Sequence, residues 1–418
     1  MVSYPQVYFN LSMGIHGEPF DIHEKKILVF DALTSRVAYM KKKQRFGLAT
    51  PEIDYIEGQI YPQCQMGFTE STLACIRQWF SGKAVEEKLC VLSSDAIRIQ
   101  HDNNTADQCC FMLSGVHSEW QIYIGMVNRP VYTAEEIRPY FPMCYDIAAS
   151  IGLTVIFTVG DAYSSNLTLI SEVQHGDLNL DEARHIYWGI DLAHMFATLS
   201  RAFSTKNSVR YDSVDVNFDH VNLERFNLQH HTSFFQSNYF YDTFDMEKYT
   251  ELFNVRVAMN LTYMQRVAEQ QDQGQQVQGQ QVQQQQLIAS LRATRKYLEN
   301  MIAFSKLFTE DNNSTAEEKE IRLACVYRFL RKIDVSHVQH YIRTIQTIRL
   351  MLREVGDMKI MRLTTHSNIE KFFYNIRKHC QGKPTFRTLK YAKARQDAVI
   401  EYVDWDMEMY WNEFMFLR

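Results

Sequence analysis

The sequence lacks the short patterns that most directly assign a chemistry. It has no Cys-x-x-Cys pair, no Gly-x-Ser-x-Gly, no phosphate-loop Gly-Lys-Ser/Thr and no His-Glu-x-x-His. Six of the eight cysteines stand in apolar or mixed segments, which is typical of buried thiols rather than of disulfides or zinc ligands. We therefore expect free cysteines and no bound zinc.

The sequence also predicts neither a leader peptide nor a membrane-spanning helix. The first twenty residues have no basic start, no continuous apolar run and no small-residue cleavage site. The longest apolar stretch, Ile147 to Val159, is too short to cross a bilayer and contains Ser150, Thr154 and Thr158. These absences predict a soluble, cytoplasmic protein with no membrane-spanning helix.

The charge is small on average and uneven along the chain. The 44 basic and 49 acidic residues give a net charge of −5, which argues against a wholly basic nucleic-acid binder. Residues 287–418 carry 23 basic and 16 acidic residues, a local +7, so residues 1–286 carry 21 and 33, a local −12. A chain of 418 residues is also too long for one ordinary core. We therefore expect at least two domains.

A glutamine-rich tract lies where the charge changes sign. Glutamine fills 12 of the 17 positions of residues 270–286, and composition leaves open whether the tract is a disordered linker or a polar helical extension. We predict an α+β fold in which a small sheet-rich lobe and a larger helical lobe precede an all-α C-terminal domain. The predicted parts are a sheet-rich lobe at 1–130, a mainly helical lobe at 131–269, a linker or insert at 270–286 and a basic helical domain at 287–418.

Hydrophobic periodicity places the elements of the first two parts. We expect strands at 25–30, 35–40, 89–92, 97–100, 110–113, 120–125, 155–159 and 167–170, and helices at 70–80, 142–151 and 180–202.

Asp161 and Asn166 stand five positions apart between two predicted strands. In phosphoryl transfer to a hydroxyl, an aspartate takes the acceptor's proton while an asparagine at this spacing holds magnesium. The arrangement resembles the catalytic loop of the protein-kinase-like superfamily, over roughly residues 14–205. The resemblance implies ATP and magnesium as cofactors, Asp161 as the catalytic base, Asn166 and Asp177 as metal ligands, Lys41 or Lys42 as the phosphate-binding lysine and Glu57 as its ion-pair partner.

The match to that family is incomplete. The glycine-rich loop is reduced to Gly14 and Gly17, and Leu178-Asn179 follows Asp177 where the family has Phe-Gly. The resemblance therefore implies a divergent kinase-like protein, either a phosphotransferase or a pseudokinase that acts as an interaction or assembly module. The alternative interpretation of Asp161 and Asn166 is an ordinary turn between strands.

The segment from Val355 to Arg395 carries ten basic and two acidic residues, with aromatic residues between them. Basic charge attracts phosphate and exposed aromatics stack unpaired bases, so the segment predicts RNA contact. A solvated helical face over buried aromatics, or contact with an acidic protein surface, explains the same pattern. The candidate nucleic-acid ligands are Arg362, Lys371, Arg377, Lys378, Lys383, Arg387, Lys390 and Lys393.

Three functional classes follow. The first is the kinase-like protein. The second is a non-enzymatic viral structural or assembly protein, in which the glutamine tract and the apolar residues 410–416 contact a protein partner or a second copy. The third is an RNA-binding accessory protein that uses the basic C-terminal helices.

Overall fold

The structure is a computed structural model. It describes residue 44 and residues 66–101, 104–127, 133–161, 164–175, 186–204, 209–221, 255–272, 278–309, 314–356, 367–380 and 382–402.

The chain divides into two compact units. Unit 1 comprises Met1–Val155 and Lys371–Arg418, and unit 2 comprises Ile156–Glu370. The C-terminal segment therefore belongs to the same unit as the N-terminal part of the chain. The boundary predicted at 270–286 lies inside unit 2.

Unit 1 is built on three antiparallel strands, β1 (Leu89–His101), β2 (Asn104–Gly115) and β3 (Gln121–Met126). The strands predicted at 89–92 and 97–100 are one continuous strand, β1, because Ser93, Ser94 and Asp95 between them are themselves buried in the sheet. Strand β2 contains the run predicted at 110–113, and β3 contains all but the first residue of the run predicted at 120–125. They are rich in residues that are almost wholly inaccessible to solvent, which is typical of a sheet covered on both faces.

Three helices of unit 1 come from the first part of the chain, and two of them begin at a capping threonine. Helix α5 (Glu70–Ser81) begins after Thr69, whose hydroxyl accepts from the Thr72 amide, and it buries Ile76 and Phe80. Helix α6 (Ala134–Ile137) starts with a capping box between Thr133 and Glu136. Helix α7 (Tyr140–Ser150) packs Phe141 edge-on against Phe111 of β2, with the ring centroids 5.3 Å apart. A single 3-10 turn at Glu86–Lys88 leads into β1.

Two parallel strands extend the sheet, which has the order β3-β2-β1-β4-β5. Strand β4 (Thr154–Gly160) agrees with the prediction at 155–159, whereas β5 (Tyr187–Ile190) lies inside the predicted helix 180–202. Strand β5 pairs in parallel with β4, and glycine permits the close packing at position 189, because a Cβ there would come within 2.7 Å of Phe157 and 2.9 Å of Thr344. The helix α9 begins only at Leu192 and ends at Ser204.

The strand predicted at 167–170 is wrong. These residues belong to helix α8 (Ser164–His175), where Leu167 and Ile170 are buried at the spacing of one helical turn. A short apolar run is compatible with either element, and here the chain needs a helix after a buried parallel strand.

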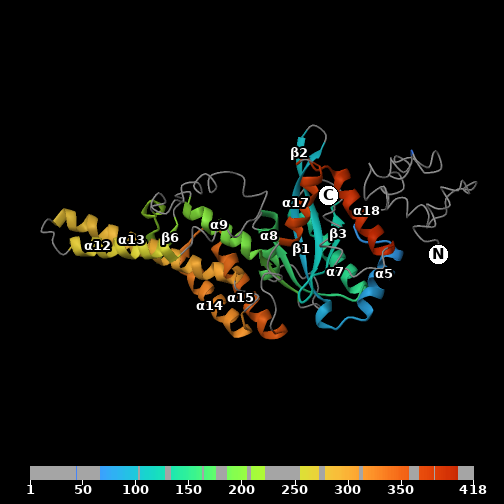
Figure 1. Ribbon diagram of the computed structural model, residues 1–418, viewed down its shortest axis with the longest axis horizontal. Coiled ribbons are helices and arrows are strands. Elements are labelled where there is room, and N and C mark those ends of the chain that lie inside the picture. The colour runs from blue at the N-terminus through green and yellow to red at the C-terminus, as the bar shows by residue number, and fades with distance from the viewer. Residues whose placement is uncertain are drawn as a thin grey trace, which may run out of the picture. The chain divides into compact units, whose positions relative to one another are not determined.

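The rest of unit 2 is mostly helical (Figure 1). A small sheet of order β7-β6-β8 joins the two-residue strands Arg210–Tyr211, Val214–Asp215 and Ile333–Asp334, and a 3-10 turn covers Phe218–His220. Helices α12 and α13 lie side by side, and α14 and α15 follow. The bounds are α12 Val255–Asp272, α13 Gln278–Thr309, α14 Ala316–Leu330 and α15 Val338–Val355.

The described part of the glutamine tract is helical. Residues 270–272 end α12, and residues 278–286 form the beginning of α13. The tract is thus a polar helical extension in its described part, because α12 and α13 pack along each other and the tract continues both helices.

The mixed α/β class is confirmed, with a mixed five-stranded sheet. The two-lobed kinase-like layout is not what the structure shows, and the predicted hairpin at 25–30 and 35–40 lies outside the described residues. The seven described cysteines carry thiols, of which Cys90, Cys109, Cys110 and Cys144 are buried. No helix within the described ranges is long and apolar enough to cross a membrane.

Candidate nucleic-acid interface

The basic segment of the C-terminal region forms two helices joined by a tight turn. Helix α17 (Ser367–His379) and helix α18 (Phe386–Tyr402) are drawn in red in Figure 1. Gly382, at φ +80°, donates its amide to the Arg377 carbonyl at 2.7 Å and so closes the end of α17. Thr385 caps α18, because its hydroxyl accepts from the Thr388 amide at 3.2 Å.

The predicted nucleic-acid ligands differ in their exposure. Lys371, Lys378, Lys383 and Arg387 are exposed, Arg377 and Lys390 are partly buried, and Lys393 is only 1% exposed. Lys393 therefore does not fit its predicted role, since its ammonium group is enclosed by the protein. Arg362 lies outside the described residues.

The aromatic side chains of the segment mostly belong to the core. Phe372 and Phe373 are buried, and Phe372 packs against Tyr123 of β3 with the ring centroids 4.5 Å apart. Phe386 lies beneath the Lys390 ammonium at 5.1 Å, and Tyr374 is exposed. The helical spacing of residues 369, 372, 373 and 376 places these apolar side chains on one face and leaves the basic residues on the other.

The turn between the helices is fastened to the central sheet. The Gln100 amide of β1 donates to the Pro384 carbonyl at 2.8 Å, and Gln100 also forms a parallel bridge with Thr385. Helix α18 packs against β1, β3 and α5 in unit 1. The exposed cations therefore stand on a fixed support.

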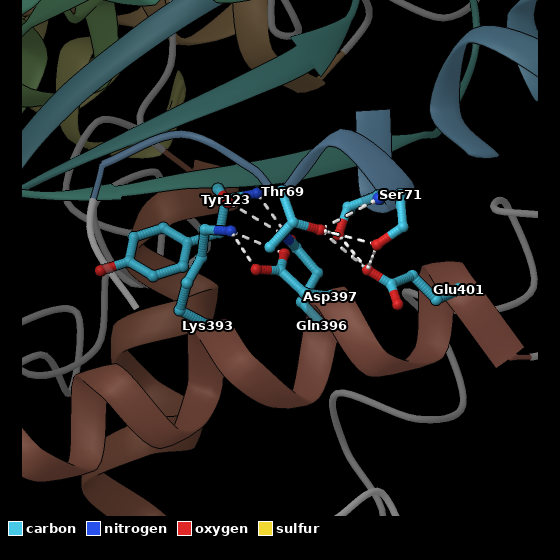
Figure 2. Close-up of polar contacts among 8 residues, drawn as sticks. Thr69, Ser71, Tyr123, Lys393, Gln396, Asp397 and Glu401 are labelled. Carbon is cyan, nitrogen blue, oxygen red and sulfur yellow. Dashed lines mark hydrogen bonds and ion pairs between the residues drawn. The ribbon is translucent and has the colours of Figure 1, made fainter. Parts of the chain in front are cut away.

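A polar side chain at the centre of α18 covers the edge of the sheet (Figure 2). The Gln396 Oε1 accepts from the Tyr123 amide at 2.7 Å, and its Nε2 donates to the Tyr123 carbonyl at 2.8 Å. Strand β3 is the last strand of the sheet on this side, so its outward backbone groups have no neighbouring strand. One glutamine amide takes the place of a strand residue.

An ion pair lies one turn away on the same helix. The Lys393 Nζ donates to both oxygens of Asp397, at 2.6 and 2.5 Å, and lies 4.1 Å from the centre of the Phe68 ring. The Asp397 side chain is 15% exposed. Burial raises the pKa of this carboxyl group, and the neighbouring Lys393 lowers it without reversing the direction.

The end of α18 holds the beginning of α5. One carboxylate oxygen of Glu401 accepts from the hydroxyl groups of Thr69, Ser71 and Thr72, at 3.0, 2.7 and 2.5 Å (Figure 2). More than 300 residues separate these partners in sequence. The residues that support the interface were missed by sequence analysis, because Gln396 and Glu401 carry no local signal beyond membership of a helix.

The structure brings two of the predicted kinase residues together. Asp161 follows β4, and the Asn166 amide of α8 donates to its carboxylate at 2.6 Å. Asn166 is on a helix and only 3% exposed, not on a loop that faces a cleft. A Cβ at Gly160 would come within 3.0 Å of the Asn166 side chain, so glycine permits this close approach. Lys41, Lys42, Glu57 and Asp177 lie outside the described residues.

Unit 2 contains a groove of about 650 Å³ between the β6–β7 hairpin and α13. Three cations line it, and each pairs with an acid: Arg292 with Glu269, Lys296 with Glu299 and Lys332 with Asp212. The positive charge of the groove is therefore largely compensated. Among the residues that the structure describes, no cluster of three or more His, Cys, Asp or Glu is placed to hold a metal ion.

Comparisons with known proteins give a likeness of fold. No family model matches the sequence, and no curated protein does. The structure is similar to a solved structure described as the Drosophila P element transposase strand transfer complex. The TM-score is 0.63 at 13% sequence identity, and the match covers 96% of both chains. The chain thus shares its fold with a transposase over nearly its whole length.

This likeness corrects the kinase-like resemblance, which is wrong. A match over 96% of the chain accounts for nearly all of it with one fold, whereas the kinase motifs covered only its first half. The pair that suggested a kinase loop is a strand end and a helix joined by one hydrogen bond. The prediction of ATP and magnesium depended on that resemblance and has lost its support.

Proposed function

We propose that this chain is a nucleic-acid-binding protein built on a transposase fold. The observation that carries the proposal is the likeness to a transposase in a strand transfer complex, which extends over 96% of each chain. A shared fold alone does not transfer a function, so the chain's own surface has to support it. The exposed cations at the end of α17 and the start of α18 supply that support.

The basic surface belongs to a chain whose net charge is −5. Between residues 371 and 396 there are eight basic residues and neither aspartate nor glutamate, and the charge of one of the eight, Lys393, is offset by Asp397 just beyond this range. A local positive field of this kind attracts phosphate even on an acidic protein, because charges beyond about 10 Å are screened at moderate salt. The proposed partner is therefore DNA, contacted mainly through its phosphates.

The proposal is tested by the binding of the full chain to a labelled DNA duplex of about 30 base pairs, measured from about 50 to 200 mM salt. We expect log K to fall linearly with log salt concentration, with a slope of several units. Absence of binding at the lowest salt would contradict the proposal. A second binding measurement uses a pre-formed strand-transfer product as the DNA. It shows whether this chain prefers the kind of DNA named in the description of the similar transposase structure.

The earlier alternatives remain predictions. The viral assembly role requires self-association, which light scattering of the purified chain measures. The RNA-binding role requires that RNA outcompete DNA. A competition experiment between unlabelled RNA and unlabelled DNA distinguishes RNA binding from DNA binding.

A further inference from the structure

The exposed cations Lys378, Lys383 and Arg387 form what we call the basic turn. It comprises the end of α17, the turn itself and the first part of α18. All three side chains are exposed. The inference drawn from them depends on the proposed function, because it assigns the surface through which the chain holds nucleic acid.

The basic turn is presented rigidly. The Gly382 amide closes α17 on the Arg377 carbonyl, and the Gln100 amide of β1 holds the Pro384 carbonyl directly after Lys383. Thr385 and Thr388 exchange hydrogen bonds, each hydroxyl accepting from the other's amide, at 3.2 and 3.1 Å. Cations on a fixed support lose less conformational freedom on binding than cations on a mobile segment.

The burial of the neighbouring aromatics decides which part of a nucleic acid the turn recognises. Proteins that hold single strands stack unpaired bases on exposed aromatic rings. Here Phe372 and Phe373 are buried, and Phe386 is partly buried with Lys390 lying over its ring. Tyr374 on α17 is the one exposed aromatic among the described residues of this segment. The surface thus offers several cations and a single ring for stacking, which favours a phosphate backbone whose bases are paired.

We propose that the basic turn binds the phosphate backbone of duplex DNA. Lys378, Lys383 and Arg387 each neutralise a phosphate, and the positive end of the α18 dipole adds to their attraction. The contact reads no sequence, because phosphates are alike along the duplex. Lys393, enclosed beneath the surface, holds Asp397 instead of DNA.

The test compares two triple variants of the full chain. The first carries Lys378→Gln, Lys383→Gln and Arg387→Gln. The matched control carries Arg292→Gln, Lys296→Gln and Lys332→Gln, which remove the same charge from the groove in unit 2. We expect the first variant to lose about tenfold or more in affinity at low salt and to lower the salt slope by up to about 2.7, and the control to change both far less.

The outcomes separate the two proposals. If the wild-type chain binds no DNA, the proposed function fails. If it binds and both triple variants lose the same affinity, or neither loses any, the basic turn is not the contact surface and only this inference fails. We expect the first variant to keep the wild-type unfolding temperature, because the three replaced side chains are exposed. An unchanged unfolding temperature shows that its loss of affinity is not due to misfolding.

Competition identifies the nucleic acid. Unlabelled duplex DNA should displace the labelled duplex at lower concentration than single-stranded RNA of the same length. Stronger displacement by the RNA would overturn the assignment of duplex DNA, and would favour the RNA-binding alternative.

Discussion

The side-chain amide of Gln396 forms two hydrogen bonds with the backbone of Tyr123, one through the amide and one through the carbonyl. Both residues are buried, and 273 positions separate them in sequence. This pairing closes the outer edge of β3 and fixes the helix that carries Arg387 of the basic turn. A helix side chain here does for an edge strand what another strand would otherwise do.

Replacing Gln396 is expected to expose this edge. Gln396→Leu leaves a buried amide and a buried carbonyl unpaired, at a cost of about 1–3 kcal/mol for each group. The exposed Gln78 of α5 provides the control, and Gln78→Leu should change the free energy of unfolding by less than about 0.5 kcal/mol. Urea unfolding measures both, and hydrogen exchange should show faster exchange of the Tyr123 amide in Gln396→Leu alone. Equal effects of the two substitutions would refute this role for Gln396.

The Lys393–Asp397 pair predicts a pH dependence of stability. Burial raises the pKa of Asp397 in the folded chain above its ordinary value of about 3.9, so between these two values the folded state holds more protons than the unfolded state. Its contribution to stability therefore falls as the pH rises through that window. Asp397→Asn removes the window, and the difference in unfolding free energy between wild type and this variant should shrink or change sign as the pH rises.

Removing the lysine should widen the same window. Lys393→Met leaves the Asp397 carboxylate enclosed without its cation, so the pKa of Asp397 rises further and the variant loses about 3–5 kcal/mol at neutral pH. The loss should be smaller below pH 4, where the carboxyl group is protonated. A pH-independent loss would show that Lys393 contributes only through packing.

The hydrogen bond between Asp161 and Asn166 in unit 2 can be tested by exchanging the acid and the amide between the two positions. Asn166→Asp places two carboxylates side by side, and their repulsion destabilises the fold at neutral pH by about 2–4 kcal/mol. Protonation of one of the two carboxyl groups removes the repulsion, so stability should return as the pH falls. The double variant Asp161→Asn with Asn166→Asp restores one acid and one amide, and should recover most of the loss. Failure to recover would mean that the two side chains are not interchangeable in this setting.

Much of the local structure could be predicted from the sequence. The helix predicted at 70–80 is α5, and the helical domain predicted at 287–418 agrees with α14, which starts with a capping box of Thr315 and Glu318, and with α15, which ends at Gly356. The prediction for residues 167–170 failed because four apolar residues fit a strand or a helix equally well until their neighbours are known. Strand β5 was missed for a similar reason, since its pairing with β4 outweighs the helical pattern around it.

The candidate interface was predicted in part. The density of basic residues after residue 355 is a property of composition, and the structure places these residues on and between α17 and α18 where they are described. Exposure determines which of the basic side chains are accessible to a nucleic acid. Lys383 is on the surface, whereas Lys393, ten positions later, is enclosed and paired with Asp397. The kinase resemblance failed because a spacing of five residues between Asp161 and Asn166 is common, and the same two residues bond to each other here.

The sequence by itself determined the mixed class of the fold, the free thiols of the seven described cysteines and the basic character of the C-terminal helices, because these depend on composition and on periods of two to four residues. Only the tertiary structure decided that residues 371–418 belong with the N-terminal unit and that Glu401 holds the start of α5. Such contacts join segments hundreds of residues apart. The free energy of such a contact depends on which groups become buried against each other, and a local sequence pattern contains no information about that.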